Sequence, residues 1–193
     1  MLASITPLGE RSRGFSWGLT ASAFAVGAVA AGAAGGAIGG ALGSLAPGGG
    51  WRTAAGLAVL AAAVCFDGTR LGRRLPTSRR QVNEDWLGRY RGWVYGVAFG
   101  AQLGTGLATV VTSAAVYAAA VGAVLCGTVA GGAAVGAAFG LTRALSLLPA
   151  RIARDGAGLI RLHAALGRLE RPARRLVVVG EILALGLLIG GLT

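Results

Sequence analysis

The chain has 193 residues, 54% of them hydrophobic and 13% charged, and its mean hydropathy is +0.68. An ordinary soluble domain carries about 25% charged residues, so the composition argues against such a domain and indicates a protein of the lipid bilayer. All 18 basic residues are arginine, and alanine and glycine abound, which is typical of a GC-rich bacterial genome. The net charge of +11 is gathered in blocks rather than spread over one face, so nucleic acid is not expected as a partner.

Two arginine blocks set the expected topology. Between them, residues 92–142 carry no charge, and this stretch makes about 76 Å of helix at about 1.5 Å per residue. Two crossings of a hydrocarbon core about 30 Å thick fit that length, so both blocks face the same compartment, which the positive-inside rule identifies as the cytoplasm. The blocks consist of Arg70, Arg73, Arg74, Arg79, Arg80, Arg89 and Arg91, and of Arg143, Arg151, Arg154, Arg161, Arg168, Arg171, Arg174 and Arg175.

The sequence therefore predicts an all-α fold, a polytopic transmembrane helix bundle that forms a single integral membrane domain over residues 1–193. Five spans and one interfacial amphipathic helix are expected in a bacterial plasma membrane, with the N-terminus in the cytoplasm and the C-terminus outside. The expected spans cover about residues 15–46, 51–69, 92–117, 121–148 and 174–193, and the expected cytoplasmic loops cover residues 70–91 and 149–173.

The first span is long for one crossing, since residues 15–46 make about 48 Å of helix. A six-span topology, in which this stretch divides into two short helices and the N-terminus lies outside, is therefore an alternative. A cleaved signal peptide ending near AVAAGAA is a weaker one, because no polar stretch follows it.

Glycine recurs at every fourth position in three of the spans. In lipid the hydrophobic effect does not drive helices together, and small residues at this spacing let two backbones approach closely. We therefore expect glycine-zipper packing. The series are Gly32, Gly36 and Gly40; Gly35, Gly39 and Gly43; Gly92, Gly96, Gly100 and Gly104; and Gly132, Gly136 and Gly140.

Two glycine-rich stretches also suggest an internal duplication. GAVAAGAAGGAIGG, from Gly27, and GTVAGGAAVGAAFG, from Gly127, match at nine of fourteen positions. In the five-span topology these helices run in opposite directions, as in the inverted repeats of many transporters. Shared alanine and glycine bias is the alternative explanation.

The second span carries Cys65 and Asp67 near its inner end, and Asp67 is expected to pair with Arg70 at the interface. Cys126 is expected near the outer end of another span, too far from Cys65 for a disulfide. Each thiol is a redox candidate only if it exchanges disulfides with a partner.

The third span has a polar face opposite its glycines. On an ideal helix Gln102, Thr105, Thr109 and Ser113 lie on that face, together with Thr112. They predict a solute pathway, although threonine and serine also bond to their own helix, so structural contacts between helices are the alternative. Before this span, the aromatic residues Trp86, Tyr90 and Trp93 predict an interfacial belt.

The stretch RGWVYGVAFGAQLGTGLATVVTSAAVY, residues 91–117, resembles the membrane domain of the cytochrome c biogenesis and DsbD-type (CcdA-type) thiol reductant carriers. The resemblance implies a bundle built on inverted repeats, in a superfamily that includes exporter-like relatives. Those carriers have a Pro-Cys-type motif where Ala101, Gln102 and Leu103 stand here, so it implies an inherited bundle without the thiol chemistry.

In the second arginine block, Arg154, Arg161, Arg168 and Arg175 recur every seven residues beside leucines at three- and four-residue steps. This pattern predicts an amphipathic helix that ends at Pro172 and lies on anionic lipid headgroups. Docking to a cytoplasmic partner is the alternative.

Glu181 is the only acid well inside an apolar span. A carboxyl group at mid-membrane costs about 3 kcal/mol on insertion scales and therefore needs a partner. We expect a proton or cation site that faces the stripe from Gln102 to Thr109. A neutral acid sharing one hydrogen bond is the alternative.

The sequence contains no phosphate-binding loop, readable nucleophile and base, metal cluster or cofactor motif, so an enzyme is not expected. The favoured hypothesis is a transporter- or permease-like protein that moves a small solute or ion. One alternative is a CcdA-type transmembrane thiol/disulfide reductant carrier using Cys65 and Cys126. Another is a non-catalytic membrane subunit of a larger complex, with a second copy or another membrane protein as partner.

Overall fold

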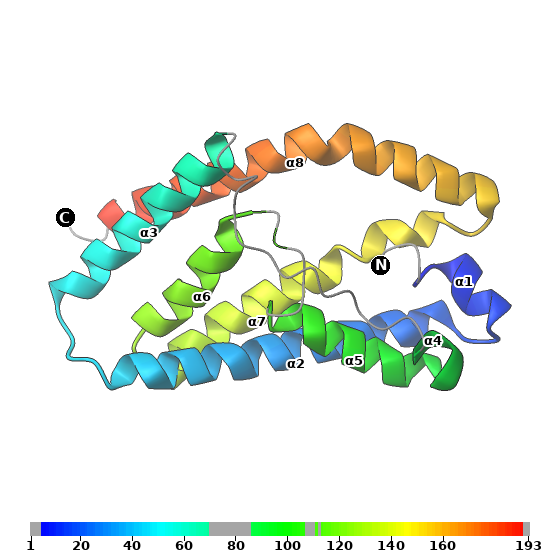
Figure 1. Ribbon diagram of the computed structural model, residues 1–193, viewed down its shortest axis with the longest axis horizontal. Helices are drawn as coiled ribbons and strands as arrows, with labels where there is room; N and C mark the ends of the chain where they lie inside the picture. The colour runs from blue at the N-terminus through cyan, green and yellow to red at the C-terminus, as the bar shows by residue number, and fades with distance from the viewer. Residues whose placement is uncertain (1–4, 70–85, 107–110, 112, 191–193) are drawn as a thin grey trace. The chain divides into compact units, whose positions relative to one another are not determined.

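The computed structural model describes residues 5–69, 86–106, 111 and 113–190, and every regular element within these ranges is helical (Figure 1). Long uncharged runs rich in alanine, leucine and valine favour helix because all backbone hydrogen bonds are then satisfied within the segment. The elements are α1 (Pro7–Ser12), α2 (Trp17–Ser44), α3 (Gly50–Gly68), α4 (Trp86–Arg89), α5 (Gly92–Gly104), α6 (Ala115–Leu125), α7 (Val129–Leu145), the 3₁₀ helix η2 (Leu148–Ile152) and α8 (Gly156–Gly190).

Three helical segments are long and apolar enough to cross a membrane: α2, α3 and Val129–Ile152, which joins α7 and η2. The apolar helix α6 is shorter. Along α2, the side chains of Leu19 and Ile38 are 58% and 63% exposed, an arrangement that is costly in water and suited to hydrocarbon. The chain therefore has the helices of a multi-pass membrane protein. Helix α2 runs for 28 residues without a break, so the division required by the six-span alternative is not seen in it.

The chain divides into two compact units. The first unit consists of Met1–Gly32, Arg80–Thr109 and Ala137–Leu169, and the second of Ala33–Arg79, Val110–Gly136 and Glu170–Thr193. Helices α2, α7 and α8 each begin in one unit and end in the other.

The core of the first unit is built from the N-terminal segment, α2, α5 and the region around η2. The Trp86 ring stacks on Phe99 with a centroid distance of 6.2 Å, whereas Tyr90 and Trp93 remain about half exposed. Trp86 therefore packs against this core, unlike the other two members of the expected aromatic belt. The buried core residues are Ile5, Phe24, Ala28, Tyr95, Phe99, Ala144, Leu147, Ala150, Ala153 and Leu162.

Glycines bring the backbones of this unit into direct contact. A Cβ added at Gly100 of α5 would fall on the carbonyl oxygen of Phe24 in α2, and one added at Gly104 would fall on that of Ala28. Gly140 of α7 approaches the same Ala28 carbonyl. Three helices thus meet at Ala28, which is fully buried.

The second unit contains a reciprocal contact of the same kind. A Cβ at Gly36 of α2 would fall on the carbonyl oxygen of Gly132 in α7, and a Cβ at Gly132 would fall on that of Gly36. Gly40 and Gly136 lie in the same contact. Gly35, in contrast, has nothing within 4 Å of its would-be Cβ, and Gly32 is buried.

Two of the expected spans are not continuous helices, and both predictions were wrong on this point. Helix α5 ends at Gly104 and α6 begins only at Ala115, so residues 92–117 do not form one helix. The stretch 121–148 is interrupted between α6 and α7. Both helices that end here are followed by a glycine in the left-handed region, Gly106 at φ +70° and Gly127 at φ +61°, which is a common way for a helix to stop.

Helix α8 corrects a third expectation. It runs unbroken for 35 residues and contains Pro172, so the predicted amphipathic helix and the predicted last span are one helix. Proline removes a single backbone donor and costs about 3 kcal/mol inside a helix. The leucine-, alanine- and arginine-rich sequence on both sides favours helix strongly enough to continue through it.

Candidate functional site

The second unit buries two carboxyl groups, Asp67 at the end of α3 and Glu181 in α8. Asp67 is 3% exposed and Glu181 is 6% exposed. The Asp67 carboxylate lies close enough to Glu181 to act on it electrostatically. Because acids are rarely buried without a partner, this pair is the natural starting point for a functional site.

Asp67 caps the start of α6. Its carboxylate accepts a hydrogen bond from Ser113 Oγ at 2.5 Å and others from the backbone N–H of Ala114 at 2.9 Å to each oxygen. The first N–H groups of a helix lack partners within the helix and form its positive end, so a carboxylate there is stabilised as an anion. Asp67 is therefore held in place by α6, a helix of 11 residues that is about 16 Å long.

Arg174 of α8 binds the end of the helix that carries Asp67. Its Nε donates to the backbone carbonyl of Asp67 at 2.7 Å, and its terminal nitrogen donates to the carbonyl of Thr69. The last carbonyls of a helix lack partners and are its negative end, so a guanidinium is well placed there. The expected partner of Asp67, Arg70, lies outside the described residues.

Glu181 differs from Asp67 because its carboxylate is not satisfied. Neither of its oxygens accepts a hydrogen bond from an N–H or O–H group of the described residues, and the side chain that its carboxyl group meets is the Asp67 carboxyl group. It lies seven residues after Arg174 on α8, which is about 10 Å along the helix axis. A buried carboxyl group without a partner is costly and marks a position where a proton or a ligand binds.

The predicted polar face of the third span does not lie on one helix, because α5 ends at Gly104. Gln102 is half-buried at the end of α5, and the exposed Thr105 donates from Oγ1 to the Gln102 carbonyl at 2.9 Å, a bond to its own helix end. Thr109 and Thr112 lie outside the described residues. Ser113 follows the end of α5 and donates to the Asp67 carboxylate of its own unit.

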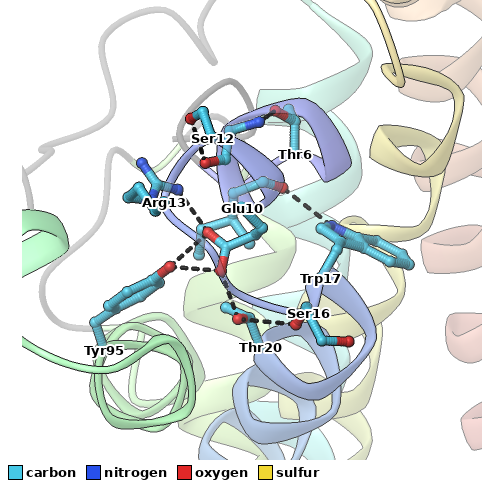
Figure 2. Close-up of polar contacts among 10 residues, drawn as sticks. Thr6, Glu10, Ser12, Arg13, Ser16, Trp17, Thr20 and Tyr95 are labelled. Atoms are coloured by element: carbon cyan, nitrogen blue, oxygen red, sulfur yellow. Dashed lines mark hydrogen bonds and ion pairs between the residues drawn. The ribbon is translucent and has the colours of Figure 1, made fainter.

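The first unit contains a buried acid that the sequence analysis did not identify. Glu10, in α1, is completely buried. As Figure 2 shows, its carboxylate accepts from the Tyr95 hydroxyl at 2.5 Å to each oxygen and from Thr20 Oγ1 at 2.6 Å. It also forms an ion pair with Arg13 at 2.5 Å. Burial alone would lower the pKa of Arg13, but the bonds to Glu10 and the nearby Tyr95 raise it above its ordinary value, so Arg13 stays charged.

The local sequence explains why Glu10 reaches this position. In TPLGE, Thr6 caps α1 by accepting from the Gly9 N–H at 3.1 Å, and Pro7 occupies the first turn. The Trp17 indole donates to the Ile5 carbonyl at 3.3 Å and ties the segment to the start of α2 (Figure 2). Threonine followed by proline was the signal that could have predicted a folded N-terminal helix.

Cys65 and Cys126 are both exposed free thiols. Within the described parts of the chain, no group of three or more histidine, cysteine or acidic side chains could hold a metal ion. The candidate site of the second unit therefore consists of two carboxyl groups, those of Asp67 and Glu181, and the Ser113 hydroxyl.

Comparison with known proteins gave no match: no family model fits the sequence, and no curated protein or solved structure is significantly similar to it.

Proposed function

We propose that this protein is a transporter- or permease-like membrane protein that moves a small solute or ion through a site formed by Asp67, Ser113 and Glu181. The observation that carries the proposal is the buried carboxyl group of Glu181, which accepts no N–H or O–H hydrogen bond from the described residues, beside the fixed carboxyl group of Asp67. Ionisable residues within membrane helices are rare and mark ion and proton pathways.

The short helix α6 supports the same proposal. At about 16 Å, it is too short to cross a hydrocarbon core of about 30 Å. Irregular backbone at membrane depth is tolerated where protein buries it or where it lines a water-filled cavity. Discontinuous helices whose ends point at charged groups are a common plan of transporter sites, and Asp67 occupies the N-terminal end of α6.

The exposed arginines in the first part of α8, among them Arg161 and Arg168, fit the proposed contact with anionic lipid headgroups. The vesicles used to test transport should therefore contain anionic lipid.

Flux in proteoliposomes tests the proposal. Vesicles loaded with a pH-sensitive dye receive inward gradients of Na⁺, of K⁺, and of mixtures of amino acids, sugars and small carboxylic acids. We expect proton movement with at least one of these probes for the wild-type protein and at least a tenfold lower rate for Glu181→Gln.

Glu170→Gln is the matched control, because Glu170 is an exposed acid of the same helix. It should retain the wild-type rate. Rates equal to those of protein-free vesicles for all the probes would contradict the proposal.

A thiol reductant carrier remains a second candidate because Cys65 and Cys126 are free and exposed. It requires both thiols to cycle between reduced and disulfide-bonded forms with a partner. Alkylation in intact membranes with and without reductant distinguishes it from transport, because a transporter of the proposed kind shows no change in labelling.

A further inference from the structure

The two carboxylates of the second unit have different bonding states. Both oxygens of Asp67 are occupied by the start of α6, through Ser113 Oγ and the Ala114 N–H. Neither oxygen of Glu181 accepts a hydrogen bond from an N–H or O–H group of the described residues, and its carboxyl group meets that of Asp67. Asp67 is therefore the carboxyl group that α6 holds in place, and Glu181 is the group that is left to exchange a ligand.

The two carboxyl groups limit the ligand to one positive charge. Asp67 is 3% exposed and Glu181 is 6% exposed, so both lie away from water. Two like charges that meet in a buried position are strongly unfavourable, so the second carboxyl group of the pair is not ionised without a partner. One bound positive charge removes this cost.

The scarcity of oxygen ligands selects the proton among the available cations. A calcium ion takes about six to eight oxygen ligands and magnesium demands an octahedral shell. Here the oxygens of Asp67 are already used, and no cluster of three acidic or metal-binding side chains exists in the described chain. A proton needs only one oxygen of Glu181.

We infer that Glu181 binds a single exchangeable proton, taken from and returned to bulk water, beside the Asp67 carboxyl group that α6 holds in place. This inference deepens the proposed function, on which it rests for the role of the site, and identifies the coupling ion as H⁺.

Other titratable groups lie close to these residues in the sequence. They are Cys65 on α3, two residues before Asp67; Tyr117 on α6, four residues after Ser113; and Arg174 and Arg175 on α8, both exposed to solvent. The two buried carboxyl groups, Asp67 and Glu181, therefore decide the charge of the site.

Infrared difference spectroscopy of the purified protein in lipid nanodiscs tests the inference without measuring flux. We expect a protonated carboxylic-acid C=O band at neutral pH that shifts in deuterium oxide and is lost in Glu181→Gln. The control variant Glu170→Gln should retain it. Titration in weak buffer should show one proton fewer bound per chain in Glu181→Gln than in the wild type.

Two further variants separate the inference from a merely structural role of Glu181. In Asp67→Asn the neighbouring carboxyl group is lost, so the cost of ionising Glu181 falls and the band should disappear at neutral pH although Glu181 is present. Asparagine is itself a good helix cap, so α6 should be retained. In Arg174→Gln the band should persist.

The inference is wrong if the wild type lacks the band, or if the band persists in folded Asp67→Asn. Circular dichroism shows whether that variant is folded, and if it is not, the wild-type and Glu181→Gln spectra still decide. Flux without the band would leave the transport proposal standing, whereas the band without flux would contradict only that proposal.

Discussion

Each of the two units contains a buried glutamate, Glu10 in the first and Glu181 in the second. The two differ in how many hydrogen-bond donors their carboxyl groups receive. Around Glu10 in the first unit, a tyrosine, a threonine and an arginine donate to the carboxylate, so its charge is neutralised and its oxygens are occupied. Glu181 in the second unit has no such partner among the described residues.

The difference is the one expected between a structural acid and the transport acid that we propose. Breaking a satisfied buried network leaves unpaired donors and a stranded charge, so the Glu10 network should contribute to stability. An acid that receives no hydrogen bond from a donor contributes little to stability. Substitution of Glu10 should therefore lower stability, whereas substitution of Glu181 should lower transport and leave stability nearly unchanged.

The largest loss of stability is expected for Glu10→Ala, at about 3 kcal/mol. Removing one member of a buried ion pair typically costs about 3–5 kcal/mol, and the lower value applies because the Arg13 side chain remains 26% exposed. Reversible unfolding of the purified protein in mixed micelles measures it. Glu170→Ala, an exposed acid, should change stability by less than about 0.5 kcal/mol. Equal losses for the two variants would remove the distinction between the sites.

Tyr95→Phe should destabilise the protein by about 2 kcal/mol, since hydrogen bonds to charged groups contribute about 1.5–3 kcal/mol. The same unfolding assay applies. Tyr90→Phe is the control, because Tyr90 is half exposed, and should have almost no effect. If Tyr95→Phe were as stable as the wild type, the hydrogen bond from the Tyr95 hydroxyl would not stabilise the Glu10 carboxylate.

Gly132→Ala should cost about 1–2 kcal/mol and lower flux, because the added methyl group would meet the Gly36 carbonyl and force α2 and α7 of the second unit apart. Gly35→Ala should cost nothing, because there is open space at its Cβ and alanine favours helix. If the two variants unfolded alike, close backbone contact would not be what holds the second unit.

Glu181→Gln is expected to keep wild-type stability within about 1 kcal/mol, because glutamine has nearly the shape of the protonated acid and no N–H or O–H group of the described residues donates to Glu181. Transport should nevertheless be lost. A destabilisation as large as that of Glu10→Ala would place Glu181 in the same structural class as Glu10.

The smallest effect is expected for Cys65→Ser combined with Cys126→Ser. Both thiols are exposed, and transport through the acid pair does not use them, so flux and stability should stay within error of the wild type. A loss of flux that only this double substitution causes would favour the thiol carrier.

Several features follow from the sequence alone because they depend on local composition. Long uncharged stretches predicted membrane-spanning helices, and α2 and α3 begin and end within about two residues of the expected bounds. Glu181 stood out because an acid in an apolar helix is unusual whatever surrounds it. The glycine spacing indicated which faces of a helix could approach a neighbour.

The tertiary structure decided which polar groups meet, because the partners are far apart in the chain. Tyr95 and Glu10 are separated by 85 residues, and Ser113 and Asp67 by 46, so no periodicity connects them. Helices α5 and α6 end next to Gly106 and Gly127, which adopt positive φ. In the sequence these two glycines look the same as the glycines inside helices, so the breaks could not be predicted. A hydrogen bond requires position and direction in three dimensions, whereas the apolar character of a helix depends mainly on the residues of one segment. This is why apolar helices such as α2 and α3 could be predicted and the partners of the buried acids could not.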